Sequence, residues 1–191
     1  MLISSGLSWG KIWSGLHCKH LARKGGSNLH FEKATFTEFT EALELYGYHF
    51  TLDEIVTIYS QIRLPERATR YSAGYDFFVP FTFYLNGGND RVIPSGIKVS
   101  FEWYEKAKWH LQLYTRSSLG IRNKIVLTHG TGIIDADYAG VILIPLHNQS
   151  NEGKRFEAGD KIIQGVFQQY GIASDDAAIE TRTGGVGSTG R

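Results

Sequence analysis

Gly132-Ile-Ile-Asp-Ala-Asp-Tyr-Ala-Gly140 leads directly into Val141-Ile-Leu-Ile-Pro145, so two carboxylates and a tyrosine lie between two apolar segments. Strand-forming residues with Asp and Gly between them are typical of a β-hairpin or a tight corner. Such a corner can present one carboxylate, Asp135, and one aromatic ring, Tyr138, to the same small space. Taken alone, the stretch favours a plainer interpretation, in which Asp135 forms an Asx turn and only fixes its own backbone.

The composition of the whole chain favours a single β-rich domain. Its 191 residues can form one domain with a hydrophobic core. There are 22 glycines and 4 prolines, and aromatic residues make up 13%, a mixture that favours strands. The 20 basic and 19 acidic residues leave a formal net charge of +1. We therefore expect neither a nucleic-acid partner nor a membrane-surface partner.

The single cysteine, Cys18, excludes an intrachain disulfide and favours a reducing, cytoplasmic location. His17 and His20 lie beside it, but one thiolate and two crowded imidazoles do not make a structural zinc site. No apolar run is long enough to cross a bilayer. The N-terminus lacks the basic and apolar regions of a signal peptide, so we expect none.

Two capping boxes predict two short helices near the start of the domain. Thr35-Phe-Thr-Glu38 opens the first helix, which Gly47 ends, and Thr51-Leu-Asp-Glu54 opens the second. The apolar face of the first helix comprises Phe36, Phe39, Leu43 and Tyr46, and that of the second comprises Ile55, Ile58, Tyr59 and Ile62. We expect both helices to pack on a β core rather than to carry chemistry.

The sequence after Leu64 predicts short strands separated by turns. This pattern is typical of an all-β sandwich, barrel or jelly roll. The expected strands cover residues 75–84, interrupted by Pro80, and residues 91–93, 97–103, 108–115, 124–128, 141–147 and 161–170.

The two ends of the chain lack this periodicity. Residues 1–30 are expected to be a poorly ordered extension, and residues 31–191 a single domain with a flexible, glycine-rich tail over 181–191. The tail contains Gly185-Val-Gly187-Ser-Thr-Gly190, a literal GxGxxG pattern, but no helix can follow it before Arg191. What remains is a strip of N–H groups and hydroxyls suited to wrapping around an anion.

Five stretches carry residues with catalytic or binding chemistry. They contain Asp76 within Ala73-Gly-Tyr-Asp76, then Arg116-Ser117-Ser118, the Asp135 and Tyr138 stretch, Gln164, and finally Arg182 with the Ser188 and Thr189 hydroxyls. Together they supply phosphate donors, an aromatic ring, and carboxylates able to hold a water or a hydrated Mg²⁺. This set suits attack of water on a phosphoanhydride. Each has a structural alternative: the Arg-Ser-Ser stretch as a helix cap, for example, or Gln164 as a partner of a neighbouring strand.

The order of these stretches resembles that of the trimeric deoxyuridine triphosphatases (dUTPases). Their five motifs correspond to Ala-Gly-Tyr-Asp, Arg-Ser-Ser, Ile-Asp-x-Asp-Tyr, Gly-Asp-Lys-Ile-x-Gln and Gly-Gly-x-Gly-Ser-Thr-Gly, and the resemblance runs from about Phe31 to the C-terminus. It implies a β jelly roll, a homotrimer with active sites shared between subunits, and Mg²⁺-dependent hydrolysis of dUTP to dUMP and pyrophosphate. Such an activity keeps uracil out of DNA and supplies dUMP for dTMP synthesis.

The resemblance also implies a role for each motif. Asp135 would activate the water that attacks the α-phosphorus, a contribution of about 10²–10⁴ in rate. Tyr138 would lie against the deoxyribose and exclude a ribose 2′-hydroxyl, while main-chain groups from Gly132 to Ile134 would read uracil. The phosphates would be held by Arg116, Ser117, Ser118 and Gln164. Asp76 would lie near the metal, through water, or near the tail arginine. The tail would close over a neighbouring subunit's site with Arg182, Val186, Gly187, Ser188 and Thr189.

Three positions depart from the common dUTPase pattern. Val186 stands where most members carry an aromatic residue that stacks on uracil, and losing that stacking costs about 1–3 kcal/mol. Many members place the tail arginine one position earlier, at Thr181, rather than at Arg182. His129 stands where many members have an Asn that helps to read the base. We therefore expect a weaker lid rather than an inactive enzyme.

Two alternative functions remain open at this level. A dCTP deaminase would share the fold and the Arg-Ser-Ser stretch, but such enzymes usually have Ile-Asp-Pro-Gly-Trp where this chain has Ile134-Asp-Ala-Asp-Tyr138. The other is a weakly active regulatory protein on the dUTPase scaffold that binds nucleotide or a protein partner. Val186 and the unusual N-terminus favour this second alternative.

Overall fold

The computed structural model describes residues 29–101, 109–180 and 182, and it is built mainly of β-strands. The expectation for residues 1–28 lies outside the described residues. The elements are, in chain order, β1 (His30–Lys33), α1 (Phe36–Leu45), α2 (Leu52–Gln61), β2 (Tyr75–Phe78), β3 (Phe83–Leu85), β4 (Asp90–Pro94), β5 (Ile97–Ser100), β6 (Trp109–Thr115), the π-helical turn η1 (Ser118–Arg122), β7 (Ile125–Leu127), β8 (Gly132–Ile134), β9 (Leu143–Asn148), β10 (Lys154–Phe156) and β11 (Lys161–Gln169).

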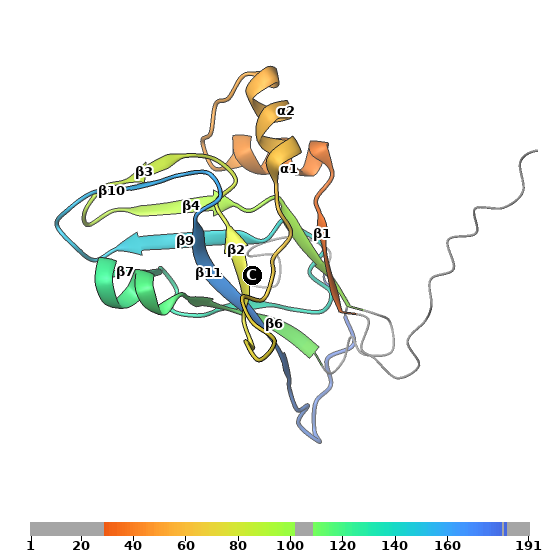
Figure 1. Cartoon of the computed structure of the whole chain (residues 1–191). Helices are drawn as coiled ribbons and strands as arrows, with labels where there is room; N and C mark the ends of the chain where they lie inside the picture. Colours follow the sequence, from red (N-terminus) through yellow and green to blue (C-terminus); the bar gives the residue numbers. More distant parts are fainter. Residues whose placement is uncertain (1–28, 102–108, 181, 183–191) are drawn as a thin grey trace, which may run out of the picture.

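Both predicted helices are present and begin at their capping boxes. The Thr35 hydroxyl accepts the Glu38 N–H at 3.2 Å, and the Thr35 N–H donates to the Glu38 carboxylate at 2.7 Å. Thr51 and Glu54 repeat this exchange at the start of α2. The two helices lie together at one end of the strands (Figure 1). Phe39 and Leu43 are fully buried on α1, which confirms that the helix packs on the β core.

The paired strands are all antiparallel and form the predicted jelly-roll architecture. The largest sheet has the order β2-β11-β6-β8, a second sheet has the order β4-β9-β7, and two-stranded sheets join β1 to β5 and β10 to β3. The long strand β11 is central, because it pairs with β2 on one side and β6 on the other. Phe77, Leu111, Leu113 and Ile163, from the three strands of this region, are almost fully buried in the core.

The structure decides between the hairpin and the corner at Asp135. β8 pairs with β6, whereas β9 pairs with β4 and β7, so the strands on either side of Asp135 belong to different sheets. The hairpin alternative is therefore wrong and the corner is correct. A periodic sequence pattern identifies both strands but cannot say whether they pair with each other, because pairing depends on distant partners.

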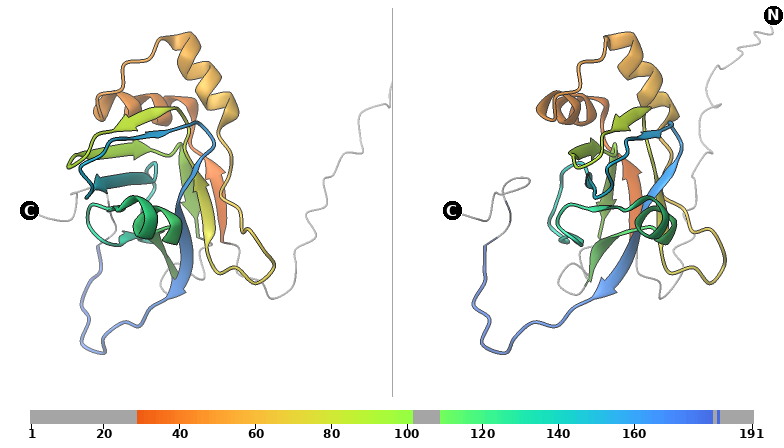
Figure 2. Two further views of the ribbon diagram at one scale, coloured as in Figure 1. Left: turned by 60° about the vertical axis from the view of Figure 1, so that its left-hand side comes forward. Right: turned by 90° about the vertical axis from the view of Figure 1, so that its left-hand side faces the viewer.

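The chain leaves the body of the protein after β11 and then returns. Figure 2 shows the segment that follows β11, in blue, extending away from the strands and turning back toward them. The returning segment brings Arg182 to the corner beside Asp135. None of the helices formed by residues 29–101 and 109–180 is long and apolar enough to cross a membrane.

Candidate active site

The corner between β8 and β9 is fixed by its own backbone and by β6. Ile134 pairs with Leu111 of β6, which ends the strand immediately before Asp135. The Tyr138 N–H then donates to the Asp135 carbonyl at 3.1 Å, so residues 135–138 form a tight turn. The Asp135 side chain is 47% exposed and can therefore meet water or a ligand at the surface.

The ring of Tyr138 is held in one orientation by the end of the same turn. Its hydroxyl donates to the Val141 carbonyl at 2.8 Å. A side chain at Gly140 would place its Cβ 2.8 Å from that hydroxyl and 2.9 Å from the ring, so the tyrosine can keep this position only beside a glycine or after a shift. Burial raises the pKa of Tyr138, which keeps the hydroxyl neutral as a hydrogen-bond donor.

Arg182 connects the returning tail to both carboxylates of the corner. Its Nη2 lies 2.5 Å from Asp135 Oδ2, and its Nε lies 3.6 Å from Asp137 Oδ1. The backbone N–H of Arg182 also donates to Asp137 Oδ2 at 3.1 Å, and its guanidinium lies 5.6 Å from the centre of the Tyr138 ring. Asp137 thus anchors the tail, a role that its sequence context alone did not indicate.

A cavity of about 370 Å³ lies beside this corner. Its lining residues are Tyr46, Val92, Leu113, His129, Gly132, Ile133, Ile134, Tyr138, Leu143, Pro145 and Arg182. Because β8 is the outermost strand of its sheet, one edge of its backbone has no strand partner among the residues that the structure describes. The cavity therefore combines apolar walls with main-chain hydrogen-bonding groups, as small-molecule pockets commonly do.

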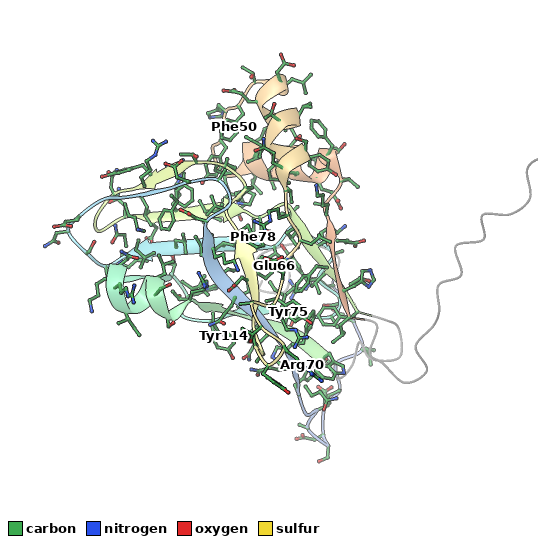
Figure 3. All side chains as sticks on the ribbon, in the orientation of Figure 1. Phe50, Glu66, Arg70, Tyr75, Phe78 and Tyr114 are labelled. Atoms are coloured by element: carbon green, nitrogen blue, oxygen red, sulfur yellow. The ribbon has the colours of Figure 1, made fainter. Side chains whose placement is uncertain are left out.

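A second group of predicted residues gathers around Asp76. Asp76 lies within β2, inside the strand expected over residues 75–84, and is only 5% exposed. Its Oδ1 lies 3.0 Å from Arg116 Nε, and its Oδ2 lies 3.0 Å from Lys161 Nζ. Arg116 also donates to the Lys161 carbonyl at 3.3 Å. Lys161 was not among the predicted residues, although it belongs to the same motif as Gln164. Figure 3 labels Tyr75 and Phe78, which flank this region on β2.

Gln164 lies opposite Asp76 in the register of β11 and β2. A Cβ at Gly74 would lie 2.4 Å from Gln164 Oε1, so the glycine of one motif makes room for the amide of another. Ser117 and Ser118 are exposed where β6 ends and η1 begins, as the sequence predicted for the start of a short helix. Arg116, Ser117, Ser118 and Gln164 thus share one end of the β6–β11 pair.

The predicted residues therefore form two groups. The corner half-site comprises Asp135, Asp137, Tyr138 and Arg182 with the adjoining cavity, and the sheet half-site comprises Asp76, Arg116, Ser117, Ser118, Lys161 and Gln164. Continuing the β6–β8 register by one residue places Asp135 level with His110, six positions from Arg116 along β6. Six residues of strand span about 20 Å. One chain consequently holds its two half-sites far apart.

The residues of the sheet half-site do not suit a directly bound metal ion. Asp76 is already neutralised by a guanidinium and an ammonium group. Among the described residues there is no group of three or more His, Cys, Asp or Glu side chains placed to hold a metal. The expected tail contacts of Val186, Gly187, Ser188 and Thr189 lie outside the described residues.

Comparisons with known proteins identify the family of the chain. The family model described as dUTPase matches residues 60–190. A deoxyuridine 5′-triphosphate nucleotidohydrolase from Lactococcus lactis is 36% identical over 147 residues, covering 72% of this chain and 95% of that protein. One from Xanthomonas oryzae is 38% identical over 136 residues, covering 66% of this chain and 84% of that protein.

Solved structures show the same relationship. The crystal structure of a dUTPase from Streptococcus mutans matches with a TM-score of 0.56 and 25% identity, covering 75% of this chain and 98% of that one. A mutant dUTPase from phage phi11 of Staphylococcus aureus, with 24% identity and a TM-score of 0.54, shares the fold. The motifs in their order, the jelly roll and these relatives together show that the chain belongs to the dUTPase family.

Proposed function

We propose that the protein hydrolyses dUTP, adding one water to give dUMP and pyrophosphate. Family membership supports the reaction, and the similarity to deoxyuridine 5′-triphosphate nucleotidohydrolases supports the substrate. The observation that carries the proposal is the corner half-site. There a half-exposed carboxylate, Asp135, lies beside a cavity with a fixed tyrosine wall.

The cavity suits a uracil nucleoside. Main-chain groups on the outer edge of β8 can form hydrogen bonds with the edge of a pyrimidine, while Leu143 and Pro145 supply apolar walls. Tyr138 would lie against the sugar, and its ring, fixed by the bond to Val141, would leave no room for a 2′-hydroxyl. The main-chain atoms of Gly132 and Ile134 take part in this recognition, because the Ile134 side chain is buried in the core.

Asp135 would accept a proton from the water that attacks the α-phosphorus, and the P–O bond to the pyrophosphate leaving group would break. The Arg182 guanidinium lies 2.5 Å from the Asp135 carboxylate. The guanidinium would have to transfer to the phosphates before Asp135 can act as a base. A tail arginine that exchanges one anionic partner for another suits this role, because guanidinium groups bind carboxylates and phosphates alike.

The separation of the half-sites supports active sites shared between subunits, and the resemblance to the trimeric dUTPases supports three subunits. About 20 Å of strand between Arg116 and the level of Asp135 is far longer than the distance from the α- to the γ-phosphorus. The phosphate donors Arg116, Ser117, Ser118 and Gln164 would therefore act on a nucleotide held by the corner of another subunit. Closure by the tail, with Ser188 and Thr189 on the terminal phosphates, belongs to the same proposal.

Magnesium enters this proposal as part of the substrate, the Mg²⁺ complex of dUTP. Mg²⁺ keeps several waters and is commonly held through substrate phosphates, whose charge it neutralises. Asp76 would act by orienting Arg116 and Lys161 rather than by binding the ion, since both cations already lie 3.0 Å from its carboxylate.

The test is pyrophosphate release from dUTP, with UTP, dTTP and dCTP as controls, in the presence and absence of Mg²⁺. We expect release from dUTP alone, and only with Mg²⁺. Equal rates with UTP and dUTP would contradict the role of Tyr138. Ammonia release from dCTP would instead identify a deaminase of the same fold. Nucleotide binding without turnover would favour the regulatory alternative.

A further inference from the structure

Helix α1 lies outside the segment matched by the dUTPase family, which begins at residue 60, yet it reaches the corner half-site. The helix ends in a defined motif. The Gly47 N–H donates to the Glu44 carbonyl at 3.1 Å, and the Tyr48 N–H donates to the Leu43 carbonyl at 2.9 Å. With Gly47 at a φ of +76°, this is a Schellman C-cap. It fixes the direction of Tyr46, the C-cap residue.

The residues next to this cap are bonded to the wall of the cavity. The Tyr48 hydroxyl donates to the Val92 carbonyl at 2.9 Å and accepts from Arg91 Nε at 2.9 Å. Tyr48 is only 6% exposed, and the Arg91 guanidinium lies 4.9 Å from the centre of its ring. Since Val92 lines the corner cavity, the end of α1 is held against that cavity by a partly buried hydrogen bond.

Tyr46 separates the corner cavity from a second one. The second cavity, of about 460 Å³, lies between α1 and the corner, and it is lined by Glu38, Glu41, Ala42, Leu45, Tyr46, Tyr138, Gly140, Val141 and Leu143. Tyr46, Tyr138 and Leu143 line both cavities, so they form the wall between them. The Tyr46 hydroxyl also contributes, after burial, to the raised pKa of Tyr138, consistent with two closely placed phenols.

We propose that Tyr46 is a specificity-determining residue, which closes the sugar side of the nucleoside pocket and holds Tyr138 in the position that excludes a ribose. Without the Tyr46 ring the two cavities would join, and Tyr138 could move away from the sugar into the space behind it. The pocket would then accept a 2′-hydroxyl. The inference rests on the proposed dUTP hydrolysis and adds to it a residue that lies before the segment matched by the dUTPase family model, residues 60–190.

The test compares kcat/KM for dUTP and for UTP in four proteins: the wild type, Tyr46→Ala, Tyr46→Phe and Leu45→Ala. We expect Tyr46→Ala to reduce the dUTP/UTP ratio about tenfold or more, mainly through faster use of UTP. Tyr46→Phe keeps the ring and should keep the ratio. Leu45, 76% exposed, lines only the second cavity, so Leu45→Ala is the matched control and should also keep it.

The outcomes separate this inference from the proposed function. If the wild type is active and Tyr46→Ala has the same dUTP/UTP ratio of kcat/KM as the wild type, the role of Tyr46 alone is overturned. This holds whether the two rates of the variant are unchanged or lowered in proportion. A wild type that releases no pyrophosphate from dUTP would overturn the proposed function and this inference with it. Thermal melting checks that each variant is folded. Should Tyr46→Ala fail to fold, Tyr46→Leu keeps apolar contact without the ring, and the same loss of discrimination is expected.

Discussion

The two half-sites of this chain are built in different ways. The sheet half-site stands on paired strands, where the register of β2 and β11 sets Gln164 opposite Asp76. The corner half-site combines a turn, a returning tail and the end of a helix, held together by the contacts of Arg182 and the cap before Tyr48. Strand register fixes side chains through many backbone hydrogen bonds, whereas the corner depends on a few individual contacts. The corner is therefore the half in which specificity can change without disturbing the fold.

The largest expected effect comes from disabling each half-site separately and then mixing the variants. Asp135→Asn removes the proposed base and should lower dUTP hydrolysis about 10²–10⁴-fold. Arg116→Met, in the sheet half-site, should also abolish most activity. If the corner half-site of one subunit works with the sheet half-site of another, trimers that contain both variants regain some intact active sites. In those sites the corner half-site comes from the Arg116 variant and the sheet half-site from the Asp135 variant. Random mixing should then restore roughly a quarter of the wild-type rate, measured as pyrophosphate release from co-expressed, differently tagged chains.

Two controls sharpen this experiment. Asp137→Asn alters the neighbouring carboxylate, which contacts the Arg182 backbone and Nε, and it should weaken turnover much less than Asp135→Asn. Mixing Asp135→Asn with itself under two tags should restore nothing. Failure of the Asp135 and Arg116 variants to complement in a verified mixed trimer would show that both half-sites act within one chain.

An intermediate effect on dUTP hydrolysis is expected where the motifs that contain Gly74 and Gln164 meet in the sheet half-site. Gly74→Ala would bring a Cβ to 2.4 Å from Gln164 Oε1, so the amide must move. Because small misplacements of a binding group are costly, we expect about ten- to hundredfold lower kcat/KM for dUTP. Because the amide is the flexible end of the Gln164 side chain, it can move without disturbing the fold, and the melting temperature should change little.

A double-mutant cycle isolates the cause of that loss. In a Gln164→Ala background, Gly74→Ala should add almost nothing to the loss of kcat/KM, since the displaced amide is absent. Gly171→Ala is the matched glycine control, because a Cβ there meets no atom within 4 Å. Additive losses in the cycle would mean that Gly74 acts through its backbone rather than through Gln164.

The smallest effect concerns how the stability of the protein depends on pH through Glu38 of α1, the helix whose end forms one wall of the corner cavity. The Lys98 ammonium, with a hydrogen bond of 2.7 Å, is the largest cause that lowers the pKa of Glu38 below its ordinary value of 4.5. A lowered folded-state pKa stabilises the protein above the unfolded value, and this stabilisation is lost as the pH falls through the folded value. Glu38→Gln should therefore cost stability at pH 7 and nothing at low pH.

Urea unfolding at pH 7 and at a pH well below 4.5 measures this difference. The loss of unfolding free energy in Glu38→Gln at pH 7 should stay below about 1 kcal/mol, because the Glu38–Lys98 ion pair is partly exposed. Glu41→Gln, exposed on the same helix, serves as the control. An equal effect of Glu38→Gln at both pH values would assign the stabilisation to packing rather than to charge.

Local patterns in the sequence predicted local structure well. Both capping boxes form as expected, because their hydrogen bonds join residues only three positions apart. The strand after Pro80, the end of β6 before Arg116 and the start of a short helix at Ser118 also agree with the pattern. Five motifs in order located the residues of both half-sites, although no single motif indicated a site.

Features that depend on long-range placement could not be read in this way. The partners of β8 and β9 lie far along the chain, so the sequence left the choice between hairpin and corner open. Lys161 became part of the Asp76 cluster only through the pairing of β11 with β2. Tyr46 carried only an apolar helix pattern, which predicted packing on the core and gave no sign of a ligand cavity.

The close approach of Gly140 to Tyr138 restricts the order in which this corner can change during evolution. A Cβ at Gly140 would lie 2.8 Å from the Tyr138 hydroxyl, so a side chain there would force the ring that forms the wall to shift. A smaller residue at Tyr138 would remove the obstacle, but it would also open the pocket. A side chain at Gly140 is therefore tolerated most easily in descendants that have already changed Tyr138, and with it the proposed sugar selection, so we expect the two positions to vary together.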